Sequence, residues 1–156
     1  MAEPHPGPAD AFPVSYAIFQ LARTHRAYAA ALLRDLDLFP GQEIMLMALW
    51  EHGEQTQSEL VQLLKLDPST VAKSLRRLET AGLVTRRTLE HDRRASIVSV
   101  TQKGNALQSK IESAWRDLER ASVASLDDDQ QLEIVRMLQA IEARVARPAA
   151  HCLTTK

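Results

Sequence analysis

The first long segment of the chain, residues 14–36, carries apolar side chains at helical spacing along two adjoining lines. One line holds Leu21, Tyr28, Leu32 and Leu36, and the other holds Ile18, Ala22, Ala29 and Leu33. An apolar surface this broad predicts a helix with more than one packing partner. His25 falls in the first line, and two interpretations stay open: a hydrogen-bonded histidine within the packing, or a polar anchor for a small ligand.

A second helix is predicted over residues 42–52, after a turn at Phe39-Pro40-Gly41. Its centre, residues 44–50, is apolar on all sides, which predicts burial on every side. Such a helix would lie between two layers, where a small molecule could change the angle between them. Trp50 would offer a flat wall to an aromatic ring, so His25 and Trp50 are the candidate ligand-binding residues.

Two short helices joined by a tight turn follow. Thr56-Gln57-Ser58-Glu59 has the pattern of a capping box and opens a third helix. Asp67 can cap a fourth helix that has Pro68 at its first position and Gly82 just past its end. Val71, Leu75 and Leu78 give this fourth helix one narrow apolar stripe. The pair is a predicted helix-turn-helix.

The face opposite that stripe carries hydroxyl groups and cations without a carboxylate: Ser69, Thr70, Lys73, Arg76, Arg77 and Thr80. Short donors near a helix N-terminus suit base edges, and arginines suit guanines or phosphates. The face therefore indicates a helix that lies in a DNA major groove. Taken alone, this helix would favour the alternative of an ordinary solvated amphipathic helix.

The segment after this helix favours the DNA-binding interpretation over an ordinary solvated helix. Residues 84–89 and 96–100 are β-prone and bracket a charged tip, residues 90–95, which predicts a hairpin and hence a winged helix. An arginine at the tip, Arg94, could enter a narrow minor groove, with Asp92 holding its guanidinium. An ordinary surface ion pair is the alternative for Asp92 and Arg94.

Two long helices complete the prediction: residues 102–124, capped by Thr101, and a last helix capped by Asp127 or Asp128 that ends near Arg147. Together with residues 14–36 they carry more apolar surface than a compact winged helix can cover, which predicts a helical bundle between two subunits. The expected fold is mainly α with a small β-wing. We expect a disordered arm (1–13), one domain (14–147) with its winged helix at 41–101 and dimerisation helices at 14–36 and 102–147, and a flexible tail (148–156).

The charge is unevenly distributed. The net charge of −1 argues at first against a nucleic-acid partner. Residues 65–103, however, hold nine Lys or Arg against four acidic residues, so this block carries +5 and the remainder −6. A positive block within an acidic molecule favours a polyanion at one face.

Composition excludes several other classes. No apolar run is long enough to span a membrane and no signal pattern opens the chain, so we expect a cytoplasmic protein. The single cysteine, Cys152, rules out a disulfide framework, and the five histidines are scattered, so no metal site or cofactor is expected. The glycine loops and nucleophile or zinc motifs typical of enzymes are missing. A winged helix for protein or RNA contacts remains the alternative, although no aromatic residue interleaves the basic segment.

The order of these elements resembles the MarR (multiple antibiotic resistance regulator) family of transcription factors, over nearly all of residues 14–147. The resemblance rests on Thr56-Gln57-Ser58-Glu59-Leu60, on the run Leu75…Leu78-Glu79…Gly82-Leu83-Val84…Arg86, on Asp92-x-Arg94, and on Val100-Thr101…Gly104. It implies a two-fold homodimer on palindromic double-stranded DNA, acting as a repressor and often released by a small aromatic, phenolic or anionic effector.

By position, the resemblance implies that Ser69, Thr70, Lys73 and Arg77 read bases and that Arg94 enters the minor groove. With their basic neighbours, the expected DNA-binding residues are Ser69, Thr70, Lys73, Arg76, Arg77, Arg86, Asp92, Arg93 and Arg94. The family's peroxide sensors use a reactive cysteine in the N-terminal region. The only thiol here, Cys152, lies at the other end of the chain, so the resemblance does not extend to peroxide sensing.

Overall fold

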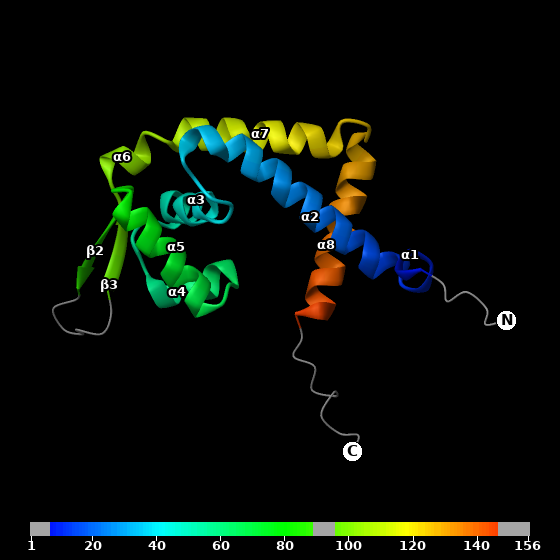
Figure 1. Ribbon diagram of the computed structural model, residues 1–156, viewed down its shortest axis with the longest axis horizontal. Coiled ribbons are helices and arrows are strands. Elements are labelled where there is room, and N and C mark those ends of the chain that lie inside the picture. The colour runs from blue at the N-terminus through cyan, green and yellow to red at the C-terminus, as the bar shows by residue number, and fades with distance from the viewer. Residues whose placement is uncertain (1–6, 89–95, 147–156) are drawn as a thin grey trace, which may run out of the picture. The chain divides into compact units, whose positions relative to one another are not determined.

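The structure of the protein is a computed structural model that describes residues 7–88 and 96–146. Its contacts divide the chain into two compact units, Met1–Leu118 and Glu119–Lys156. The first unit contains α1 (Pro8–Ala11), α2 (Pro13–Leu33), the 3-10 helix η1 (Arg34–Leu36), α3 (Gln42–His52), β1 (Gln55–Thr56), α4 (Gln57–Leu64), α5 (Pro68–Thr80), β2 (Val84–Thr88), β3 (Ser96–Val100), α6 (Gln102–Asn105) and most of α7 (Gln108–Val123) (Figure 1). The second contains the end of α7 and α8 (Asp128–Val145). The mainly α fold with a small β-wing is confirmed.

Local capping signals place the helix ends where the sequence predicts them. The Thr56 hydroxyl accepts from the Glu59 N–H while the Glu59 carboxylate accepts from the Thr56 N–H, which is a complete capping box. Asp127 and Gln130 form the same arrangement at the start of α8. Each cap satisfies N–H groups that have no partner within the helix.

Two helix predictions need correction. Part of the expected disordered arm is helical, because Gly7 precedes a proline in the first turn of α1 and the Gly7 carbonyl accepts from Asp10 and Ala11. The expected helix over residues 102–124 is broken into α6 and α7. The break leaves Gly104 against the Leu83 carbonyl, where a Cβ atom would come within 2.3 Å of the oxygen. This packing holds α6 against the segment between α5 and β2.

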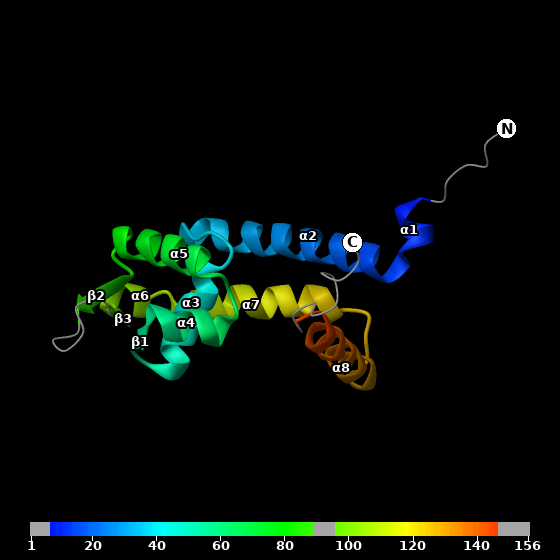
Figure 2. The same ribbon diagram turned by 90° about the horizontal axis from the view of Figure 1, so that it is seen from below.

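The wing is a hairpin extended by a third strand. β2 and β3 pair antiparallel from Val84 opposite Val100 to Thr88 opposite Ser96, as the sequence predicts for the part that the structure describes. The two residues of β1 pair with the other edge of β3, giving the order β1-β3-β2. Figure 2 shows this sheet beside α5. The sheet therefore ties the segment before α4 to the segment after α5.

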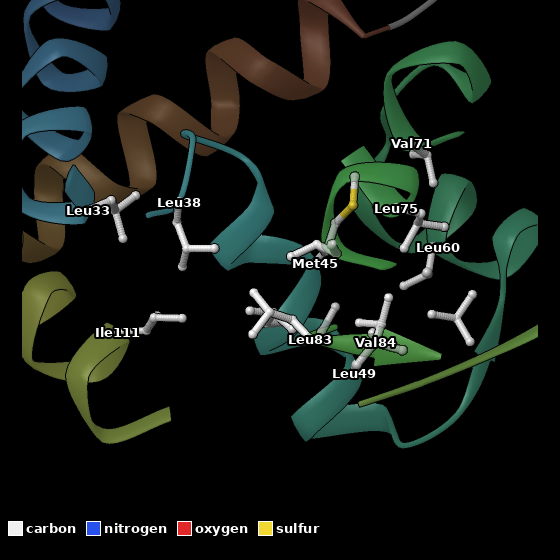
Figure 3. Packing of buried hydrophobic residues seen from close by; sticks show 14 residues of the cluster. Leu33, Leu38, Met45, Leu49, Leu60, Val71, Leu75, Leu83, Val84 and Ile111 are labelled. Carbon is white, nitrogen blue, oxygen red and sulfur yellow. The ribbon is translucent and has the colours of Figure 1, made fainter. Parts of the chain in front are cut away.

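One core holds the first unit together. Figure 3 shows buried side chains from α2, α3, α4, α5, β2 and α7 packed into one cluster, including Leu33, Met45, Leu75 and Ile111. On α3, Met45, Leu46 and Leu49 are buried, but Ile44 is 37% exposed. The prediction that α3 is buried on every side is therefore wrong for one face, where Ile44 borders an open pocket with Leu63 and Trp115.

The turn before α3 is closed by the first two side chains of the helix. Gln42 and Glu43 are both buried. The Gln42 Oε1 atom accepts from the Phe39 N–H at 2.8 Å, and the Glu43 carboxylate accepts from the Gly41 N–H at 2.7 Å. Burial raises the pKa of Glu43 above its ordinary value, although the backbone hydrogen bonds and Arg26 partly oppose this.

Candidate nucleic-acid interface

α5 divides into a buried stripe and an exposed face, as its sequence predicts. Val71, Leu75 and Leu78 have no exposed surface. Ser69, Thr70, Lys73, Arg76 and Arg77 are all exposed. The buried stripe fixes the rotation of the helix, so the hydroxyl groups and cations necessarily face outward.

The hydroxyl groups at the start of α5 are oriented by Asp67. Its carboxylate accepts from the Thr70 N–H at 2.8 Å and from the hydroxyl groups of both Ser69 and Thr70. These bonds, the Ser69 hydroxyl first, lower the pKa of Asp67 to about 2, so the carboxylate is ionised at neutral pH.

This arrangement corrects the expectation that Ser69 and Thr70 act as donors. A hydroxyl has one proton, and both protons point to Asp67, so lone pairs remain for an outside partner. In the major groove, lone pairs can accept from the amino groups of adenine and cytosine. Ser69 and Thr70 are exposed as predicted, but their hydroxyl groups have the opposite hydrogen-bond polarity to the one expected.

The end of α5 is locked to the segment after the wing. Gly82 has a positive φ of 70°, and the Leu83 N–H donates to the Leu78 carbonyl, as in a Schellman motif. The Thr101 hydroxyl donates to the Gly82 carbonyl at 2.7 Å, and the Lys103 ammonium donates to the Ala81 carbonyl at 2.8 Å. Carbonyls that the helix leaves unpaired are thus bound by residues from the far side of the hairpin.

Two arginines of β2 have different surroundings. Arg86 is only 24% exposed; its Nε lies 3.3 Å from a Glu79 oxygen, and its Nη1 donates to Gln57. Arg86 therefore links α4, α5 and β2 from within the protein, although the sequence predicted a DNA contact. Arg87 is exposed and lies 3.6 Å from Glu54, whose carboxylate also accepts from Ser99.

The remaining predicted wing residues, Asp92, Arg93 and Arg94, lie outside the described residues. Thr88 and Ser96, the paired residues that flank them, are the last described positions of the hairpin. The expected minor-groove contact of Arg94 stays a prediction.

A pocket of about 420 Å³ lies beside the C-terminal half of α5. Arg76 and Arg77 line it from α5, and Phe39 and Gln42 line it from the turn before α3. The Arg77 guanidinium lies 4.9 Å from the centre of the Phe39 ring, a cation–π contact. Sequence analysis missed Phe39 and Gln42, because only the fold brings this turn next to α5.

The two predicted ligand-binding residues, Trp50 and His25, have different surroundings. Trp50 donates through Nε1 to Asn105 at 3.0 Å and borders a pocket of about 240 Å³ with Met47 and Glu51. His25 is exposed on α2 and is not among the residues that line this pocket. A ligand site at His25 and Trp50 stays a prediction.

Two further properties bear on the chemistry of the chain. Within residues 7–88 and 96–146, no three His, Cys, Asp or Glu side chains gather as a metal site would require. None of the helices in the same residues is both long enough and apolar enough to cross a membrane.

Comparison with known proteins identifies the family of the chain. The family model described as MarR family matches residues 41–96, from the start of α3 through the wing. The organic hydroperoxide resistance transcriptional regulator of Bacillus subtilis is 33% identical over 102 residues, which cover 65% of this chain and 69% of that protein.

Solved structures share the fold. A variant of MarR from E. coli complexed with operator DNA superposes with a TM-score of 0.78 at 21% identity, covering 86% of this chain and 96% of that chain. BpsR of Bordetella bronchiseptica, described in terms of regulation of its DNA binding by 6-hydroxynicotinic acid, gives 0.77 at 22% identity, covering 83% and 98%. The extent of the sequence match and the placement of a basic α5 next to a wing lead to one assignment: the chain belongs to the MarR family of DNA-binding transcriptional regulators.

Proposed function

We propose that this regulator is a cytoplasmic repressor that binds an inverted-repeat operator as a homodimer and is released by a small aromatic or anionic ligand. The observation that carries the proposal is the pairing of two surfaces: an exposed face of hydroxyl groups and cations on α5, and exposed apolar side chains on α2 and α8. The first suits duplex DNA and the second suits another copy of the chain.

The apolar residues outside the core support a dimer. Leu21 and Phe19 of α2 are more than half exposed. No residue of α8 is buried, and Leu132, Met137 and Leu138 are each about half exposed, at 49%, 50% and 47%. Rows of apolar side chains like these on a single chain are typical of subunit interfaces.

The proposals of repression and of ligand release are supported by the descriptions of two proteins with the same fold. One solved relative is described with operator DNA and another with regulation of DNA binding by an aromatic acid. A ligand releases DNA only if it prefers the DNA-free form, and a tenfold loss of affinity needs a coupling of about 1.4 kcal/mol.

Two experiments test the proposal. In a dimer bound to an inverted repeat, the two copies of α5 enter successive major grooves on one side of the duplex. Inserting about five base pairs, half a helical turn, between the half-sites should therefore abolish tight binding in fluorescence anisotropy. Unchanged affinity would contradict the operator geometry, and equal affinity for single-stranded RNA would favour an RNA-binding role.

The second experiment places the interface. Leu138→Asp should give monomers in sedimentation analysis, because a charge would otherwise be buried against apolar surface. Gln139→Asp, at an exposed polar position of the same helix, is the matched control and should stay dimeric. A dimeric Leu138→Asp protein at micromolar concentration would locate the interface elsewhere.

A further inference from the structure

Arg86 extends from the middle of the wing towards the helix-turn-helix. Successive side chains of a strand alternate between its two faces, so Arg86 shares a face of β2 with Val84, which is buried. Across the sheet Arg86 is opposite Val98, which has no exposed surface. A guanidinium group is thus placed on the side of the sheet that carries the core.

Both helices of the helix-turn-helix hold this guanidinium. The Glu79 carboxylate, one residue before the end of α5, lies 3.3 Å from the Arg86 Nε atom. Gln57, the first residue of α4, accepts from Nη1 at 3.5 Å. The side chains of Arg86 and Glu79 are 24% and 44% exposed, whereas those of the neighbouring pair, Arg87 and Glu54, are 67% and 55% exposed. Water and salt therefore weaken the Arg86 pair less than its neighbour.

The contact between Arg86 and Glu79 depends on charge. The Nε atom is buried and has no hydrogen-bond partner among the described residues, although a carboxylate oxygen is so close. A buried donor without a partner is costly, so the position of Arg86 is held by the ionic attraction and by the packing around it. An ammonium group in the same place would keep the attraction and remove the unpaired donor.

The Arg86 contact lies farther along the wing than the other contacts with α5. Thr101 and Lys103 hold the base of the wing, because they bind carbonyls of the turn that follows α5. Glu79 precedes this turn and Arg86 follows it, in the middle of β2. Their contact spans the turn, so it restricts the direction in which the hairpin leaves α5.

We propose that Arg86 is a positioning residue for operator binding, which acts through Glu79 to fix the direction of the wing relative to α5. The inference rests on the proposed function, because it takes α5 and the wing to contact one operator together. Arg86 itself touches no DNA. Without the pair, the wing has to be ordered when the complex forms, and this entropic cost lowers the affinity for the operator.

Glu79→Gln tests the inference by the sign of its effect, measured by fluorescence anisotropy with a labelled operator. The variant removes a negative charge from α5, so on charge alone it should bind a polyanion at least as tightly as the wild type. Loss of positioning predicts the opposite, a rise in the operator Kd of about tenfold, within the range for residues joined in one network. Glu54→Gln, which makes the same change beside Arg87, is the matched control and should not raise the Kd.

Substitutions of Arg86 separate positioning from a direct DNA contact. Arg86→Met should weaken binding as much as Glu79→Gln, and the double variant should bind no more weakly than either single variant. The dependence of log Kd on log salt should keep the wild-type slope, whereas loss of a phosphate contact would lower the slope by about one. Arg86→Lys should restore the affinity, since it keeps the charge opposite Glu79. Lysine would not replace a guanidinium that bound a base through two hydrogen bonds.

Spin labels measure the direction of the wing without DNA. They are attached at Lys73→Cys on α5 and Thr88→Cys at the end of β2, two exposed positions, in a chain that also carries Cys152→Ser. The distribution of distances between the labels should be narrow without a further change and with Arg86→Lys. It should be broad with Arg86→Met or Glu79→Gln. Thermal melting shows that each variant is folded; a merely structural role would lower Tm and leave the distribution unchanged.

The outcomes separate the inference from the proposed function. The inference is overturned if Glu79→Gln binds the operator as tightly as the wild type, if Glu54→Gln weakens binding equally, or if neither Arg86→Met nor Glu79→Gln broadens the distance distribution. A lower salt slope for Arg86→Met without rescue by Arg86→Lys would instead make Arg86 a DNA contact and also overturn it. A wild-type protein that binds no inverted repeat, with distance distributions that change as expected, would overturn the proposed function and leave Arg86 as the residue that directs the wing.

Discussion

Gly104→Ala tests the packing that holds α6 against the end of α5. The φ of Gly104 is not positive, so alanine is allowed by the backbone. An added Cβ would lie 2.3 Å from the Leu83 carbonyl oxygen and 2.6 Å from a Val100 methyl group. The first neighbour is backbone that already accepts from the N–H and the hydroxyl of Thr101, so it cannot move without loss of those bonds.

The sign of the change in stability shows whether the close contact at Gly104 is present. Without the close contact, alanine in a helix is favoured over glycine by roughly 0.5–1 kcal/mol, so the variant would be more stable. Forcing a methyl group into a filled space typically costs about 1–3 kcal/mol, and we expect this cost to dominate. For a chain of this size each kcal/mol corresponds to about 2–4 °C in Tm, so Tm should fall by several degrees.

Thermal unfolding followed by circular dichroism measures the change. Gly7→Ala is the control, since the nearest atom to its Cβ would be 3.7 Å away in ordinary contact, and its Tm should stay close to that of the wild type. A Gly104→Ala protein that melts at or above the wild-type temperature would refute the packing argument.

Three further predictions follow from the site. Asp67→Asn keeps a cap for the Thr70 N–H, but its amide cannot accept the protons of both hydroxyl groups. The base preference should therefore broaden from adenine and cytosine towards guanine and thymine. An unchanged base preference, measured over singly substituted operators, would contradict this. Lys73→Ala should weaken binding evenly across sequences and lower the salt slope by about one, whereas an unaltered slope would remove Lys73 from the phosphate contacts. Because burial raises the pKa of Glu43 in the folded state, its contribution to stability is present at low pH and is lost as pH rises above 4.5 through the raised value. In Glu43→Gln, the free energy of unfolding measured by chemical denaturation should not show this fall with pH. The variant should therefore exceed the wild type in stability most clearly at neutral pH.

Signals within a few residues made most of the helix boundaries predictable. The caps at Thr56, Asp67 and Thr101 each join a side chain to an N–H three residues later, and Gly82 ends α5 through its own φ. Such contacts join residues that are close in the sequence, so periodicity and spacing predict them.

The features that sequence analysis missed depend on distant residues. Gly104 meets Leu83, β1 pairs with β3 across the whole helix-turn-helix, and Arg86 reaches Gln57 through the fold. For the candidate site, the exposed residues of α5 were predictable from one amphipathic helix. The pocket was not, because Gln42 and Arg76 approach one another only after α3 and α5 pack together.

The contacts between the end of α5 and the residues after β3 have a consequence for the operators of the proposed function. Thr101 and Lys103 bind the Gly82 and Ala81 carbonyls from beyond the hairpin, so α5 and the base of the wing form one rigid element. If both contact DNA as proposed, the distance between the base pairs that they reach cannot change independently. If two copies bind an inverted repeat, the spacing inside each half-site should stay constant among all its operators. The gap between half-sites, which is spanned only by contacts between subunits, is where length can differ as operators diverge.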